Sequence, residues 1–253
     1  MTRAVLFDLF GTLVPSPPVR EYRNVVDSVA RIAGLPVDEF FERWMSANDD
    51  RLMGTHGSSE SEIRHVMESF GNTLSDEQMA ECVRVRRDAM HRLLNPKPDC
   101  IDMLQQLSDH GIALALVSDC VFDVPAIWPS TPFAELFTIT VFSCVLGIRK
   151  PDARLYEAAM DGVGVTPSAE CLFIGDGGSN ELQGARNLGI AAYMLDDQPA
   201  DQSTVLRVDV HEWDGPSIQT LSQVPGLIAH IGQGSTSIES DNQRTHPQRL
   251  YPK

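Results

Sequence analysis

Two acidic residues stand at the ends of short apolar runs. Asp8 follows the run from residue 4 to residue 7, and Asp176 follows the run from residue 171 to residue 175. Such runs are typical of buried parallel strands, and open α/β sheets form their sites at the carboxyl ends of these strands. A carboxylate placed there can act as a nucleophile, a metal ligand or both. Two of them suit a hard octahedral cation that keeps several waters, so we expect Asp8 and Asp176 to bind Mg²⁺.

One lysine is placed to serve the same site. The chain contains only three lysines: Lys97 lies in a proline-containing linker, Lys253 is the last residue, and Lys150 stands in a turn before a predicted helix. An ammonium at that turn can pair with Asp8 and with a bound phosphate. The sequence therefore favours Lys150 as the cation of the site.

The elements that must position these residues alternate along the chain. Strands that alternate with helices imply right-handed crossovers and a parallel sheet, so we predict an α/β fold with a Rossmann-like core. After the first strand, further strands are predicted at residues 112–117, 138–144, 171–175 and 190–195, and helices at 99–110, 152–162 and 179–188. A possible edge strand at 205–210 and two amphipathic pieces, near 217–221 and 224–231, complete the pattern.

A helical insertion interrupts the core soon after Asp8. Prolines break the chain between residues 15 and 18, and apolar residues then recur at three- and four-residue spacing up to about residue 94. Asp38 and Ser75 are candidate helix N-caps, the second with Gln78 three residues later. We predict a core formed by residues 1–15 and 96–231, an inserted four-helix cap at 16–95, and a disordered polar tail at 232–253.

Composition limits the possible partners. The 253 residues are 42% hydrophobic and 22% charged, as in an ordinary globular protein. A net charge of −15 repels a polyphosphate backbone, so no nucleic-acid partner is expected. With no signal peptide and no apolar run long enough to cross a bilayer, we expect no membrane partner and a cytoplasmic location. Monomer and homodimer remain equally open.

The cysteines give no metal-binding pattern. Five cysteines are scattered without paired spacing, which predicts buried, reduced thiols. Cys120 is the one nearest a predicted site strand.

Four blocks of the chain resemble a known family. They are Asp8-Leu9-Phe10-Gly11-Thr12-Leu13, Ser118 after its strand, Lys150-Pro151-Asp152, and the segment from Gly175 to Glu181. In this order they resemble the motifs of the haloacid dehalogenase superfamily, from the start of the chain to about residue 195. The resemblance implies a Rossmann-like hydrolase with a helical cap, in which Asp8 attacks phosphorus or carbon.

The resemblance also implies catalytic roles for individual residues. Asp8 would form an aspartyl-phosphate, Thr12 would steady this nucleophile, and Ser118 and Lys150 would hold the phosphoryl group. Asp119 is a further candidate substrate contact, directly after Ser118.

A metal site follows from the same resemblance. The backbone carbonyl of Phe10 would be a third Mg²⁺ ligand beside Asp8 and Asp176. Glu181, five residues after Asp176, would act through water or on Lys150.

Phe10 departs from the phosphatase pattern. Phosphatases of this superfamily usually carry a second aspartate there, which protonates the leaving group and then activates water. A phenyl ring cannot transfer a proton, so acid–base help of roughly 10²–10⁴-fold is missing or comes from elsewhere. Phosphonoacetaldehyde hydrolases also lack this aspartate but use a cap lysine, and residues 19–94 contain no lysine.

Two other interpretations therefore accompany the phosphatase. The 2-haloacid dehalogenases carry an aromatic residue at this position, need no metal, and bind the substrate carboxylate with a cap arginine, for which Arg43 is the candidate. Glu39, four residues earlier, offers Arg43 an ordinary ion pair. The retained Asp176 favours instead a Mg²⁺-dependent phosphatase acting on a small phosphorylated metabolite. A phosphometabolite-binding protein with weak or no catalysis is the third possibility.

Overall fold

A computed structural model describes residues 1–166, 168–197 and 213–228. Its centre is a six-stranded sheet in the order β3-β2-β1-β4-β5-β6, and every neighbouring pair is parallel. The strands are β1 (Ala4–Phe7), β2 (Ala113–Ser118), β3 (Ile139–Phe142), β4 (Cys171–Gly175), β5 (Ala191–Leu195) and β6 (Ser217–Ile218). The predicted α/β class with a parallel sheet is confirmed.

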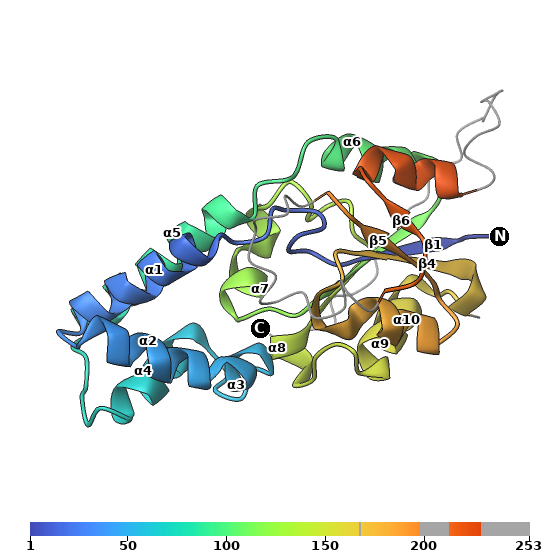
Figure 1. Ribbon diagram of the computed structural model, residues 1–253. Coiled ribbons are helices and arrows are strands. Elements are labelled where there is room, and N and C mark those ends of the chain that lie inside the picture. Colours follow the sequence, from blue (N-terminus) through green and yellow to red (C-terminus); the bar gives the residue numbers. More distant parts are fainter. Residues whose placement is uncertain (167, 198–212, 229–253) are drawn as a thin grey trace.

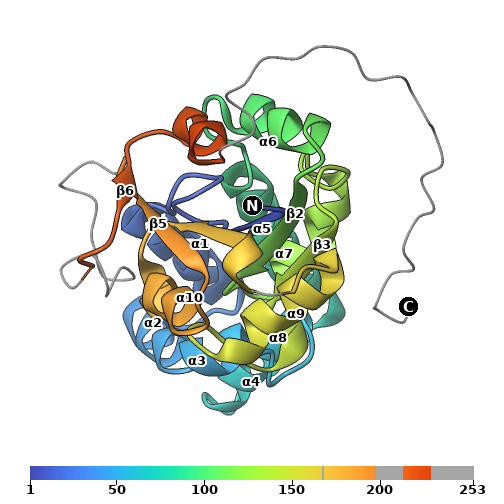
Figure 2. The same ribbon diagram turned by 90° about the vertical axis from the view of Figure 1, so that its right-hand side faces the viewer.

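The central strand β1 is buried on both faces of the sheet. Its side chains alternate between two apolar clusters: Val5 and Phe7 belong to one, and Ala4 and Leu6 to the other. Helix α6 (Cys100–Asp109) and a 3₁₀ helix (Leu221–Leu227) cover the first face, and α9 (Ala153–Val163) and α10 (Glu181–Asn187) cover the second (Figure 2). This two-sided burial explains why the strand is apolar at every position.

Shorter helices lie in the connections. They are α7 (Asp123–Ile127), α8 (Ser143–Leu146) and the 3₁₀ helices Trp128–Ser130, Ser168–Glu170 and Gly178–Asn180. Helix α8 takes up the end of the strand predicted at 138–144, so β3 is shorter than expected.

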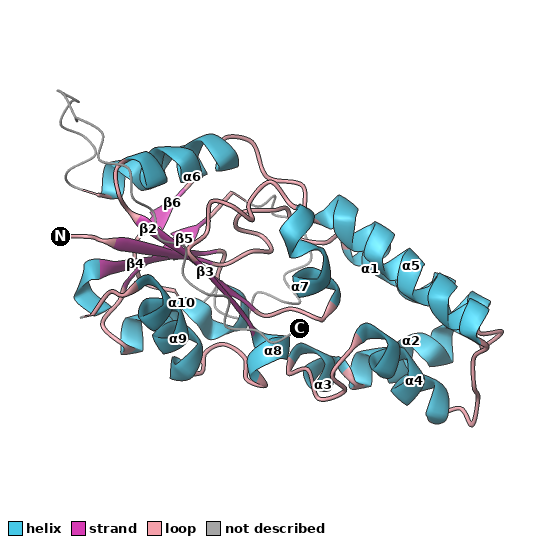
Figure 3. Ribbon diagram, turned by 180° about the vertical axis from the view of Figure 1, so that it is seen from behind, coloured by secondary structure: helices cyan, strands magenta, loops and turns pink. Residues whose placement is uncertain are grey.

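Five helices form the segment between β1 and α6, one more than predicted. They are α1 (Val19–Ile32), α2 (Val37–Ser46), α3 (Asn48–Leu52), α4 (Ser59–Glu68) and α5 (Asp76–Leu93). They pack around an apolar cluster of their own, which includes Phe40 and Trp44. They lie beyond the edge of the sheet at which β1 has its C-terminal end (Figures 1 and 3). We call α1–α5 the helical segment. The core–cap boundaries at residues 15/16 and 95/96 stay a prediction.

Helix starts in this segment test the predicted caps. Ser75 caps α5 and forms a capping box with Gln78, as predicted. Asp38 is not a cap, because α2 begins at Val37 after Pro36 and places Asp38 in its first turn.

The C-terminal part differs from the prediction. The sixth strand, β6, lies where an amphipathic piece was expected near 217–221, because Ser217 and Ile218 pair with the end of β5. The predicted strand at 205–210 and the tail at 232–253 lie outside the described residues. In the described part of the chain, no helix combines the length and apolarity needed to span a bilayer.

Candidate active site

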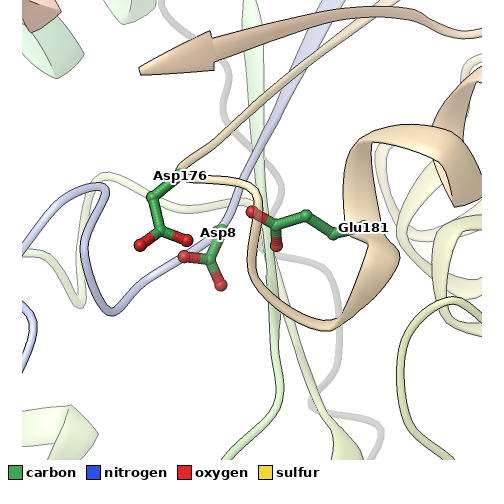
Figure 4. A group of neighbouring side chains, drawn as sticks. All are labelled: Asp8, Asp176 and Glu181. Atoms are coloured by element: carbon green, nitrogen blue, oxygen red, sulfur yellow. The ribbon is translucent and has the colours of Figure 1, made fainter. Parts of the chain in front are cut away.

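Neighbouring strands bring the two predicted acids together. Phe7 pairs with Ile174 across β1 and β4, and the Asp8 N–H donates to the Ile174 carbonyl at 2.9 Å, so Asp8 and Asp176 leave the sheet side by side. Glu181, at the start of α10, turns its carboxylate toward the same point (Figure 4). One ligand oxygen from each of the three acids lies within 4.8 Å of the others, and all three residues are buried. This arrangement is a potential cation site.

Lys150 lies among these acids. Its Nζ is 2.6 Å from Asp8 Oδ1 and also donates to Glu181 Oε2. Burial alone would lower the pKa of Lys150, but Asp8 and Glu181 raise it well above its usual value, so the ammonium stays charged. Burial and the nearby Asp8 raise the pKa of Glu181, which Lys150 opposes. This direct contact is consistent with the second predicted role of Glu181, that of acting on Lys150.

The turn after Asp8 brings two further groups to the site. Thr12 is fully buried, and its Oγ1 donates to Asp8 Oδ2 at 3.0 Å. Gly11 has a φ of +84°, and a Cβ on it would lie 2.0 Å from Asp176 Oδ2. Only glycine fits here, because the backbone of the turn lies directly against the Asp176 carboxylate.

Ser118 ends β2 beside this turn and has spare hydrogen-bonding capacity. Its hydroxyl is buried and, in the described part of the chain, has no hydrogen-bond partner beyond a weak polar contact with the Cys120 thiol. Buried hydroxyls are nearly always satisfied, so a free Ser118 hydroxyl suits a phosphoryl oxygen of a substrate. Asp119 is engaged differently: its Oδ1 accepts from the Lys150 backbone N–H at 3.0 Å. Asp119 therefore holds the Lys150 turn, and substrate contact by Asp119 stays a prediction.

Two further candidates have side chains that pack elsewhere. Phe10 is partly buried and packs against the apolar cluster on one face of the sheet. Arg43 pairs with Glu39, donates to the Ser69 carbonyl, and lies 3.8 Å over the Phe70 ring. These partners all belong to the helical segment, so a role of Arg43 toward a substrate carboxylate stays a prediction.

Comparison with known proteins identifies the family. The haloacid dehalogenase-like hydrolase profile matches residues 2–189, most of the chain. The chain belongs to this family.

Relatives and solved structures agree with this assignment. The chain is 27% identical to Phosphatase MT3486 of Mycobacterium tuberculosis over 81% of this chain and 92% of the relative. It is also 27% identical to Glyceraldehyde 3-phosphate phosphatase of Methanopyrus kandleri over 77% of this chain and 84% of that protein. A phosphatase structure from Thermococcus onnurineus matches with a TM-score of 0.62 at 22% identity, covering 90% of this chain and 98% of its own. A 2-haloacid dehalogenase from Pseudomonas syringae matches with a TM-score of 0.67 at 22% identity, covering 90% of this chain and 99% of its own. At this level of identity the two structures support the fold alone.

Arg149, which sequence analysis did not single out, connects several elements at the edge of the candidate active site. Arg149 lies 3.4 Å from Asp119, 3.5 Å from the Ser179 hydroxyl, and in an ion pair with Asp49 of α3. It therefore joins the Ser118 and Asp176 loops to the helical segment. Its place next to Lys150 was the only signal in the sequence.

A buried ion cluster, also missed, joins the helical segment to α7. Arg86 of α5 lies 2.7 Å from Glu62 of α4 and 2.5 Å from Asp123 of α7, and the Ser59 hydroxyl donates to Asp123 at 2.9 Å. The three charged residues are almost completely buried. Sequence spacing gives no hint of a contact between residues so far apart.

The cysteines are buried, as predicted, and all five are free thiols. Burial raises the pKa of Cys120 well above its usual value, so its thiol stays protonated and is a poor nucleophile.

Proposed function

We propose that this hydrolase is a Mg²⁺-dependent phosphatase that acts on a small phosphorylated metabolite through an aspartyl-phosphate intermediate. The observation that carries the proposal is the buried group formed by Asp8, Asp176 and Glu181, of which Asp8 and Glu181 pair with Lys150. The names of its relatives, among them a glyceraldehyde 3-phosphate phosphatase and a phosphoglycolate phosphatase, support the same chemistry.

Asp8 is the proposed nucleophile. One of its carboxylate oxygens forms a bond to phosphorus while the ester P–O bond breaks, and water then cleaves the acyl phosphate. Lys150 and Thr12 each donate to a different oxygen of Asp8, which orients the carboxylate before attack. The buried Ser118 hydroxyl would donate to an oxygen of the transferred phosphoryl group.

The residues present fit a divalent cation. Three buried carboxylates face one ammonium, which leaves an excess of two negative charges when all are ionised. Asp8, Asp176 and the Phe10 carbonyl would hold Mg²⁺, and their hard oxygen donors match its preference. When bound, Mg²⁺ would screen the anionic nucleophile from the anionic substrate and polarise the phosphoryl group.

Phe10 makes the leaving group decisive for the rate. Because no acid stands two residues after Asp8, a poor leaving group such as an alkoxide departs without this proton donor. The proposal therefore favours acyl and aryl phosphates, whose leaving groups need little protonation. Phe10 also supports a second candidate, a 2-haloacid dehalogenase, since halide leaves unprotonated.

A hydrolysis screen with and without Mg²⁺ tests the proposal. We expect p-nitrophenyl phosphate and acetyl phosphate to release phosphate only with Mg²⁺, and Asp8→Asn to abolish this release. Release of halide from 2-chloropropionate in EDTA would instead establish the dehalogenase. Binding of phosphorylated metabolites without turnover of any substrate would indicate the non-catalytic alternative.

A further inference from the structure

Lys97 makes contacts that a linker lysine does not need. It lies between α5 and α6, and only 9% of its side chain is exposed. Its ammonium donates to the Gly11 carbonyl and lies 2.8 Å from both carboxylate oxygens of Asp197, just after β5. Its backbone N–H donates to the Leu13 carbonyl at 2.9 Å. Lys97 thus joins the exit of the helical segment to the turn after Asp8.

The peptide held by Lys97 lies at the centre of the site. Gly11 lies against Asp176 Oδ2, where even a Cβ would not fit. The neighbouring residues are Phe10, with the proposed metal-ligand carbonyl, and Thr12, which donates to Asp8. A shift of Gly11 would therefore change the spacing between this turn and Asp176.

The rest of the turn is held from within. The Leu9 carbonyl accepts from the N–H groups of Leu13 and Val14 at 2.9 and 3.0 Å, and the Gly11 N–H donates to the Val14 carbonyl at 2.8 Å. These bonds fix the shape of the turn, whereas Lys97 ties it to a different part of the chain. The placement of the whole turn relative to Asp176 therefore depends on contacts such as that of Lys97.

We propose that Lys97 is a positioning residue for the metal site: by holding the Gly11 carbonyl, it sets the Phe10–Thr12 turn against Asp176 and couples this geometry to the segment leaving α5. The inference rests on the proposed Mg²⁺-dependent function. Groups that orient metal ligands typically change metal affinity by 10–100-fold when removed.

Three variants distinguish a lysine that positions the metal site from one that only forms an ion pair in the linker. Lys97→Met removes the ammonium, Lys97→Arg keeps a cationic donor, and Asp197→Asn removes the acid while leaving the Lys97–Gly11 contact. The readouts are Mg²⁺ affinity by calorimetry without substrate, and kcat and KM for p-nitrophenyl phosphate.

We expect Lys97→Met to weaken Mg²⁺ binding about 10-fold or more and to lower kcat, with KM changed less than about threefold. Lys97→Arg should recover most of this loss, and Asp197→Asn should keep Mg²⁺ affinity within about threefold of wild type. A folded Lys97→Met protein with unchanged Mg²⁺ affinity, or an Asp197→Asn protein with the same loss, would overturn the inference.

A measurement on the unmodified chain covers the case in which Lys97→Met does not fold. With only three lysines, ¹³Cε-labelled lysine gives few NMR signals, and Lys97→Arg assigns that of Lys97. Saturating Mg²⁺ should shift the Lys97 signal. A Lys150 signal that responds to Mg²⁺ beside a Lys97 signal that does not would refute the coupling. Wild-type protein that neither binds Mg²⁺ nor hydrolyses phosphates would refute the proposed function itself.

Discussion

The ammonium of Lys150 lies 2.6 Å from an oxygen of Asp8, 142 residues earlier in the chain. Both side chains are buried, at 3% and 7% exposure, and Glu181 completes the pair on the other side of the ammonium. Removal of one member of such a group leaves an uncompensated buried charge. Lys150 therefore contributes to stability and, in the proposed mechanism, orients Asp8 for attack.

Lys150→Met should lower both stability and activity. Loss of the ammonium leaves Asp8 and Glu181 unpaired, so the free energy of unfolding should fall by about 3–5 kcal/mol. The kcat for aryl phosphates should fall by about 10²–10³-fold through loss of an oriented donor. Urea denaturation with and without Mg²⁺ tests the first effect, and Mg²⁺ should reduce the loss because the proposed metal site includes Asp8, one of the two unpaired carboxylates.

The matched control for Lys150 is Arg84→Met, which breaks exposed ion pairs with Glu81 and Asp88. It should cost less than about 1 kcal/mol. Equal losses for the two variants would contradict the assignment of Lys150 to a buried charge cluster.

Phe10→Asp should change which phosphates are hydrolysed fastest. An acid two residues after Asp8 can protonate a leaving alkoxide, so the ratio of alkyl to aryl phosphate turnover should rise by about 10²–10⁴-fold. Phe10 packs partly against the apolar core, and a polar side chain there also lowers stability. Phe10→Asn is the matched control, because it is equally polar but transfers no proton. The same ratio in both variants would show that another residue supplies the proton.

The sequence predicted the strands and the acids because both leave a local signal. Residues 4–7 are apolar at every position, and Asp8 ends the run, so strand, edge and acid are visible together. Lys150 could be chosen because the chain has so few lysines. The register that pairs Phe7 with Ile174 then places Asp176 beside Asp8, as strand-end positions imply.

The contacts that sequence analysis missed depend on three-dimensional packing. Lys97 stands in a proline-containing segment typical of an exposed linker. Its contacts with Gly11 and Asp197 depend on how two loops that are distant in the sequence pack together. Arg86 looks like one of many helix-surface charges in α5, yet it is buried because α7 packs on that face. β6 was missed because two residues are too short for a periodic pattern.

Glu62 should make stability depend on pH. Burial raises the pKa of its carboxyl above the usual value, although Arg86 opposes the shift. The folded state therefore binds this proton more tightly, so its contribution to stability is greatest below the unfolded pKa of about 4.3 and falls as pH rises through the folded pKa. Glu62→Gln mimics the protonated form, so wild type should lose stability relative to it as pH rises above the unfolded pKa of about 4.3.

Urea denaturation of both proteins at several pH values measures this difference. Glu60→Gln, in an ion pair at the surface, is the matched control and should stay within about 0.5 kcal/mol of wild type. A constant difference between wild type and Glu62→Gln would show that Arg86 keeps Glu62 ionised throughout.

In the described part of the chain, two ion pairs join the helical segment to the elements around the sheet, and they should contribute unequally to stability. Arg86 and Asp123 are 6% and 1% exposed, whereas Arg149 and Asp49 are 30% and 74% exposed. Arg86→Met leaves the buried carboxylates of Glu62 and Asp123 without their cation and should cost about 3–5 kcal/mol, whereas Asp123→Asn keeps the Arg86–Glu62 pair and should cost less. Arg149→Met or Asp49→Asn should cost less than about 1 kcal/mol, because water screens the pair. Urea denaturation of the four single variants measures this contrast. Equal losses for Arg86→Met and Arg149→Met would contradict the expectation that the buried pair contributes more to stability than the exposed one.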